Sequence, residues 1–329
     1  MHKYIYIKNT INKRIRIDKY LFIYFKKKIS RQKIQLYILK KLILLNNKTI
    51  KKKYLLKNND VISYINKIIK LDDHNYIYSN KNLNVDIHYE DDNILIINKK
   101  PGQVVHPGHG NYKNTLVNWL KYYYNKPNIS ENNEYNNRFG LLHRLDKDTS
   151  GLLMVAKNIF TFNYIKDQFV NRTLKKTYLA IIWGTNLKNK NIIKNYIARN
   201  KKNRIKMIVV DKKYNGKLSI TKYKILKKFK FFSLIKCKLE TGRTHQIRVH
   251  FKHIGHPILN DKLYGGDKLL VKNKNYNKKI IKLLKILPRQ ALHASTLIYK
   301  DPITKNYKKI LTKIPNDIKR AIKYLKYNF

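Results

Sequence analysis

The apolar positions near the start of the chain follow helical and then strand periods. A first helix is predicted by apolar side chains that recur at i, i+3, i+4 and i+7, namely Ile17, Tyr20, Leu21 and Tyr24. Ser30 is a typical N-cap for a second helix, whose apolar face is Ile34, Ile38 and Leu42. The run 43–45 then predicts a strand that enters a turn at 46–48, and Asn59-Asp60 predicts another turn. Residues 1–13 are expected to form a basic, unstructured leader, so the first compact unit would span 14–64.

Residues 65–82 are polar and irregular, which predicts a linker to a larger unit over 83–329. Apolar runs in that unit predict strands at 94–98, 152–156, 178–183 and 231–239. Amphipathic spacing predicts helices at 114–124, 159–171 and 244–254. Thr244 is expected to cap the last of these helices and Gly255 to end it. The Lys/Asn-rich run 270–280 is expected to be a solvated loop.

Charge changes this picture, because 73 Lys+Arg stand against 19 Asp+Glu in 329 residues, a formal net charge of +54. Such an excess favours an anionic partner. However, most of the cations are lysines, and they occur beside abundant Asn, Ile and 26 Tyr, a composition that A/T-rich coding also produces. The rare arginines are more informative, since lysine cannot replace a planar, bidentate guanidinium.

Cysteine content and hydropathy indicate the cellular compartment of the protein. The single cysteine, Cys237, excludes a disulfide framework, and its position in an apolar strand predicts a core residue. The sequence contains no run of 18 apolar residues, so no membrane-spanning helix is predicted. The N-terminus lacks the apolar stretch of a secretory signal. We therefore expect a cytoplasmic protein without a membrane partner.

Two segments depart from the Lys/Asn/Ile/Tyr background. GLLHRLDKDTSG at 140–151 places a carboxylate beside an arginine in a loop before a strand, which suits an ionised nucleophile or base but also a capped turn with an exposed ion pair. ETGRTHQIRVH at 240–250 brings Arg243 and Arg248 together, although a helix with a solvated basic face gives the same pattern. The histidines that follow match no zinc spacing, so no metal is expected.

At these residues the sequence resembles the RluA family of RNA pseudouridine synthases. HRLDKDTSGLLMVAKN is similar to the family's signature motif, and further similar motifs follow in the same order over about 85–315: KKTYLA, LETGRTHQIRVHF, GHPILNDKLYGG and RQALHA. Asn260 and Lys262 depart from the family's usual Gly and Pro, and Lys100-Pro101 from its Pro-Ala. The resemblance implies an α+β fold, with a central, mainly antiparallel mixed sheet, flanking helices and an active cleft.

The resemblance also implies roles for individual residues. Asp146 matches the family's nucleophile, Tyr178 the tyrosine that packs on the flipped uracil, and Arg248 the basic partner of the aspartate. Arg144 matches an arginine that holds the RNA where the base has left the stack, and Arg243 is assigned to RNA or structural support. Uridine isomerisation adds no atom and changes no redox state, so no cofactor is expected.

Residues 14–64, which include Arg31, resemble the RNA-binding module of ribosomal protein S-four, although its usual Val-Asn-Gly turn is Leu45-Asn46-Asn47 here. Together with the signature motif, this small α+β module most resembles the RluD branch, which acts on large-subunit ribosomal RNA. We therefore expect a monomeric enzyme for that RNA. A transfer RNA synthase of the same family and a ribosome-assembly factor that only binds RNA remain the alternatives.

Overall fold

A computed structural model describes residues 2–7, 15–25, 29–65, 77–108, 110–124, 134–268 and 274–329. The chain divides into two compact units, Met1–Ile77 and Tyr78–Phe329. Within the described part of the chain, no helix has both the length and the hydrophobicity needed to cross a membrane.

The first unit packs two helices on a small antiparallel sheet with the strand order β1-β3-β2. Its elements are β1 (His2–Tyr6), α1 (Ile17–Tyr24), α2 (Arg31–Leu39), β2 (Ile43–Leu45) and β3 (Val61–Ile65). The expectation of an unstructured leader is wrong for 2–6, because β1 pairs along β3 and buries Ile5. Residues 1 and 8–13 of the expected leader, and 66–76 of the expected linker, lie outside the described residues.

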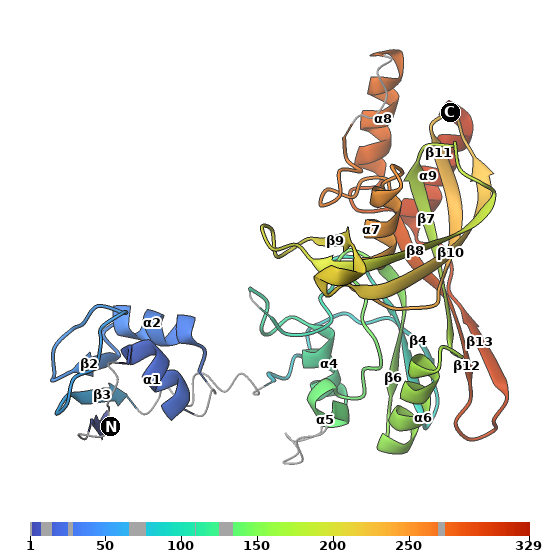
Figure 1. Cartoon of the computed structure of the whole chain (residues 1–329). Helices are drawn as coiled ribbons and strands as arrows, with labels where there is room; N and C mark the ends of the chain where they lie inside the picture. Colours follow the sequence, from blue (N-terminus) through green and yellow to red (C-terminus); the bar gives the residue numbers. More distant parts are fainter. Residues whose placement is uncertain are drawn as a thin grey trace. The chain divides into compact units, whose positions relative to one another are not determined.

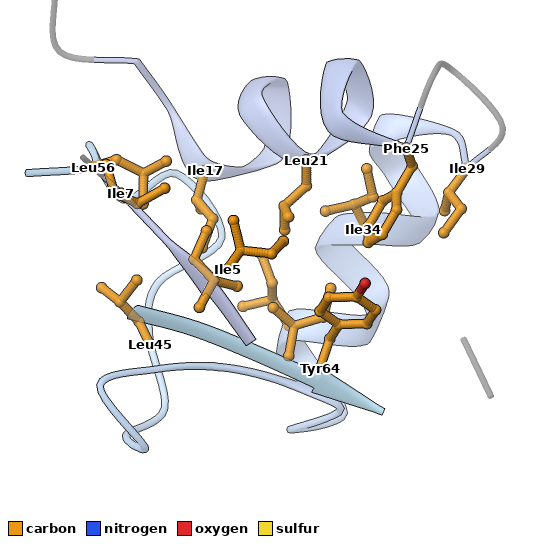
Figure 2. Packing of buried hydrophobic residues seen from close by; sticks show 13 residues of the cluster. Ile5, Ile7, Ile17, Leu21, Phe25, Ile29, Ile34, Leu45, Leu56 and Tyr64 are labelled. Atoms are coloured by element: carbon orange, nitrogen blue, oxygen red, sulfur yellow. The ribbon is translucent and has the colours of Figure 1, made fainter. Parts of the chain in front are cut away.

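The core of this unit lies between the helices and the sheet (Figure 2). Ile17 and Leu21 are buried as predicted, whereas Tyr24 of the same expected face is half exposed. Ser30 caps α2 by accepting a hydrogen bond from the Lys33 backbone N–H, but α2 ends at Leu39, so Leu42 lies beyond the helix. Asn46 and Asn47 both have positive φ values, 48° and 59°, the geometry of a two-residue hairpin turn that favours asparagine.

The second unit is built on a ten-stranded sheet with the order β4-β5-β6-β12-β7-β11-β10-β8-β9, and β13 also pairs with β12 (Figure 1). The strands are β4 (Ile87–Glu90), β5 (Ile94–Lys99), β6 (Ser150–Ala156), β7 (Lys175–Trp183), β8 (Lys190–Arg199), β9 (Met207–Val210), β10 (Lys217–Lys228), β11 (Phe232–Leu239), β12 (Leu292–Lys300) and β13 (Tyr307–Leu311). All ladders are antiparallel except β6 with β12. The four predicted strands are confirmed as β5, β6, β7 and β11. Cys237 of β11 is buried, as expected.

Helices flank this sheet and line the ends of its strands (Figure 1). They are α4 (Leu116–Tyr123), α5 (Glu134–Arg138), α6 (Ile159–Val170), α7 (Gln246–His253), α8 (Lys274–Ile286), α9 (Asn316–Asn328) and a short 3-10 turn, η1 (Lys212–Tyr214). The expectation of a solvated loop at 270–280 is wrong from residue 274 onward, because α8 buries Ile280 and Leu283 at helical spacing and packs on α9. Residues 270–273 lie outside the described residues.

Candidate active site

The segment HRLDKDTS forms an irregular loop that leads into β6 at the centre of the sheet. The Thr149 backbone N–H donates to the Asp146 carbonyl across 3.1 Å, which closes a tight turn. Gly151 follows with φ +114°, and a Cβ there would lie 2.1 Å from the Ala294 carbonyl oxygen. A glycine is therefore needed for the loop to enter the sheet this close to β12.

Two buried cations hold the backbone of this loop from distant parts of the chain. Lys99, at the end of β5, is fully buried, and its Nζ donates to the Lys147 carbonyl at 2.7 Å. Arg289 donates from Nη1 to the Asp148 carbonyl at 3.0 Å and is itself paired with Asp317 of α9. Burial lowers the pKa of Lys99 to about 7, against the attraction of nearby carboxylates. The carbonyls of Lys147 and Asp148 are thus fixed, which restrains the loop immediately after Asp146.

Arg248 of α7 lies between two carboxylates. Its Nη1 donates to Asp146 Oδ2 at 2.9 Å, while Nε and Nη2 donate to the two oxygens of Asp261 at 2.6 and 2.9 Å. Burial disfavours the charged guanidinium, but the hydrogen bonds and the attraction to both carboxylates outweigh it, so the pKa of Arg248 is raised. Asp261 occupies one edge of the guanidinium plane and orients the remaining donor toward Asp146.

His245 and Tyr264 complete the surroundings of Asp146. His245 Nε2 lies 3.8 Å from Asp146 Oδ1, and His245 Nδ1 lies 2.8 Å from the Tyr264 hydroxyl. That hydroxyl also accepts from the Met207 backbone N–H, so Tyr264 links His245 to the chain at residue 207. Burial lowers the pKa of His245, which favours the neutral ring.

His245 also corrects the expected start of α7. The helix begins at Gln246, and its N-cap position is His245, with φ +55°, rather than Thr244. A non-glycine residue in the left-handed region is uncommon, and such residues concentrate at functional sites. The predicted end of α7 is confirmed, since Gly255 follows Ile254 with φ +83°.

Tyr178 of β7 shares one cavity with Asp146. The cavity measures about 680 Å³, and Tyr178 is 7% exposed on its wall. Burial, together with the negative charge of Asp146, raises the pKa of Tyr178, so the phenol stays neutral at neutral pH. An aromatic face beside an ionised carboxylate suits a flat, neutral heterocycle.

The cavity wall is cationic. Its basic side chains, apart from histidines, are Arg138, Arg144, Lys166, Arg172, Lys176 and Arg243, against Asp146 and Glu240. Glu240 is already paired with Lys222 and Lys238 outside the cavity. Burial lowers the pKa of Lys176 to about 8, which leaves it charged at pH 7. The cavity therefore favours a polyanion that carries a flat base.

The structure thus brings together five of the six predicted site residues: Asp146, Tyr178, Arg248, Arg144 and Arg243. Arg144 and Arg243 are exposed, and Arg243 Nε donates to the Leu218 carbonyl at 3.3 Å. Arg31 belongs to the first unit, where its Nη2 lies 3.0 Å from buried Asp18 while much of the side chain remains exposed. The sequence assigned no role to Asp261 or Tyr264, although both lie in the motif GHPILNDKLYGG.

Comparison with known proteins gives matches to one protein family. Residues 93–253 match the protein family described as RNA pseudouridylate synthase. The chain is 42% identical over 246 residues to the ribosomal large subunit pseudouridine synthase D of Buchnera aphidicola subsp. Acyrthosiphon pisum (strain APS). This match covers 74% of this chain and 74% of the relative. It is 38% identical over 320 residues to the protein of that name from Buchnera aphidicola subsp. Baizongia pistaciae (strain Bp), covering 95% of this chain and 94% of the relative.

Two solved human structures share the fold. The chain superposes on human RNA pseudouridylate synthase domain containing 1 with a TM-score of 0.52 and 26% identity, over 70% of this chain and 84% of that one. It superposes on human RNA pseudouridylate synthase domain containing 4 with a TM-score of 0.55, over 73% of this chain and 93% of that one. At 24% identity, the second comparison shows the fold alone.

Proposed function

Because the chain belongs to the RluA family of RNA pseudouridine synthases, we propose that it isomerises specific uridines of large-subunit ribosomal RNA, with Asp146 as the nucleophile. Relatives that span nearly the whole chain carry the name ribosomal large subunit pseudouridine synthase, which supports this RNA as the substrate. The single observation that carries the role of Asp146 is its hydrogen bond to Arg248 at the edge of a cationic cavity.

In the proposed reaction, the bond from ribose C1′ to the uracil moves from N1 to C5. The N1–C1′ bond of the target uridine breaks, the uracil turns and a C5–C1′ bond forms. C5 gives up its proton and N1 takes up one, so the product is an isomer of uridine. Asp146 acts as an ionised carboxylate that Arg248 orients, and Asp261 keeps the guanidinium in place. No electron is gained or lost overall, so this reaction requires no redox cofactor.

The target uridine is positioned for the reaction by flipping it out of the base stack and into the cavity. Extrusion of a base costs a few kcal/mol, and packing on the Tyr178 ring offsets part of that cost, since stacking contributes about 1–3 kcal/mol per base. Arg144, on the exposed rim, is placed to hold the RNA where the base has left the stack, and Arg243 supports the backbone. In the first unit, Arg31 is proposed to contact RNA with the part of its guanidinium that Asp18 leaves exposed.

Tritium release from ribosomal RNA labelled at C5 of uridine tests the proposal. We expect Asp146→Asn to abolish release and to leave RNA affinity largely unchanged, because the shape is kept and the nucleophilic charge is lost. Asp167→Asn, which changes an exposed carboxylate of α6, is the matched control and should retain the parent rate. Release by Asp146→Asn near the parent rate would contradict the role of Asp146.

The same assay separates the alternative substrates. Release from transfer RNA but not from large-subunit ribosomal RNA would contradict the proposed substrate and leave the chemistry intact. Tight binding of ribosomal RNA by the parent protein without any tritium release would favour a ribosome-assembly factor instead.

A further inference from the structure

A second cavity lies on the opposite side of Tyr264 from Asp146. It measures about 490 Å³, within the roughly 300–1,000 Å³ of typical ligand sites. Its walls are β9, the outer face of α7 and the loop 262–268. Tyr264 lies between this cavity and the residues around Asp146. Its ring lies under the Arg248 guanidinium at 5.0 Å, and its hydroxyl contacts both His245 and Met207.

The rim of this cavity is basic. Its cationic or titratable side chains are Lys206, Lys252, His253, Lys262 and Lys268. Among the described residues that line it, none is acidic, and none of its four lysines forms an ion pair with another described residue. Asp267, the acidic residue of the loop 262–268, is not among the residues that line the cavity, so the four lysines are the charged side chains that face it.

The floor of the cavity is apolar. Met207, Val209 and Leu263 are partly buried and pack against a cluster that contains Val249 and Tyr264. Their remaining exposed surface faces the cavity that the lysines surround. Sites for single-stranded nucleic acid combine a cationic groove for phosphates with side chains that pack on bases, most often aromatic ones. Here the packing surface is aliphatic.

We propose that this cavity binds a second nucleotide of the RNA substrate, with its phosphate between Lys252 and Lys262 and its base against Met207 and Val209. The inference rests on the proposed function, and it adds a subsite that lies one side chain away from the reacting uridine. An RNA strand carries the required polyanion and flat bases at regular spacing. Tyr264 lines this cavity and contacts His245 and Arg248, so the proposed nucleotide would lie close to the target uridine.

Binding and rate measurements on the full chain test the subsite. Lys252→Ala with Lys262→Ala should weaken the affinity for a large-subunit ribosomal RNA fragment roughly tenfold and reduce the log–log salt slope by about 0.7–0.9 per lysine. The single-turnover rate at saturating RNA should remain unchanged. The matched control is Lys319→Ala with Lys323→Ala, which removes the same charge from the exposed face of α9 and should change affinity less than about twofold.

Photo-crosslinking locates the nucleotide directly. A ribosomal RNA fragment substituted with 4-thiouridine should crosslink to peptides that contain residues 206–209 and 262–264. Equal affinities of the two double variants, or crosslinks that map only elsewhere, would overturn the subsite even if the parent enzyme is active. Crosslinks at the expected peptides from a parent protein that releases no tritium would support the subsite and refute the proposed function.

Discussion

Asp261→Asn tests whether the second carboxylate sets the geometry of the site. Asp261 is buried, with 1% of its side chain exposed, and it uses both oxygens to hold Arg248. Asparagine keeps the shape but replaces one oxygen with an NH₂ group, so a donor faces a donor. The guanidinium then keeps its bond to Asp146 and one bond to residue 261, but two parallel bonds no longer fix its plane.

The structure gives the size of the effect. Loss of one charge-assisted hydrogen bond costs about 1.5–3 kcal/mol, and breaking a buried ion pair outright costs about 3–5 kcal/mol. Arg248 keeps its bond to Asp146, so we expect a decrease of about 2–4 kcal/mol in the free energy of unfolding of the second unit. That corresponds to a decrease in Tm of roughly 4–16 °C for a unit of this size. Misplacement of a catalytic group by about 1 Å lowers the rate about 100-fold.

Thermal unfolding and single-turnover tritium release at saturating RNA, measured below the Tm of the variant, separate the two effects. Asp18→Asn is the control, because Asp18 is also buried and accepts from Arg16 at 2.8 and 3.0 Å, but it belongs to the first unit. It should destabilise that unit and retain the saturated rate. A folded Asp261→Asn enzyme with the parent rate would refute the argument that Asp261 orients Arg248.

Three further predictions concern pH and domain organisation. Burial lowers the pKa of Lys176 to about 8, so its charge is present at pH 7 and lost by pH 9. RNA affinity at constant salt should therefore fall between pH 7 and pH 9. Lys176→Arg should flatten this dependence of affinity on pH. The pKa of His143 is lowered by burial to about 3, and its Nε2 accepts from the Met154 backbone N–H. The unfolded state therefore binds more protons, so the free energy of unfolding should fall as pH decreases from about 6.5 toward 4, less steeply in His143→Gln, as denaturant titration can show. Residues 78–329 expressed alone should give a cooperative thermal transition and isomerise RNA more slowly or less selectively than the full chain.

The sequence predicts the strands that are buried on both faces. β5 begins with Ile-Leu-Ile-Ile and β6 contains Leu-Leu-Met-Val, so an uninterrupted apolar run of four residues marks each strand whatever its neighbours are. β12 occupies the centre of the same sheet but was not predicted as a strand. Its first half contains His293 and Ser295, which are accommodated by hydrogen bonds to Ser150 and to the Thr177 carbonyl. Those contacts come from tertiary structure, and no local pattern indicates them.

The errors at the chain's lysine-rich segments have a common cause. In β1 and α8 only a few apolar residues reach the core, and the lysines Lys3, Lys278, Lys279, Lys282 and Lys285 are exposed. Lysine has a high helix propensity and a long apolar stem, so a polar composition does not by itself indicate a loop. In this composition the spacing of the few Ile and Leu residues is the better guide, as Ile280 and Leu283 show in α8.

The site was only partly predictable for a geometric reason. Asp146 and Arg248 are 102 residues apart, and their pairing was expected from motifs whose order was recognised rather than from any local period. The residue that completes the pair, Asp261, follows Arg248 by 13 positions, after α7 has ended and the chain has turned back. A carboxylate in such a loop is indistinguishable in sequence from a solvated one. Burial and two bonds to Arg248 distinguish Asp261 in the structure, because a bidentate partner that is shielded from water fixes the plane of the guanidinium.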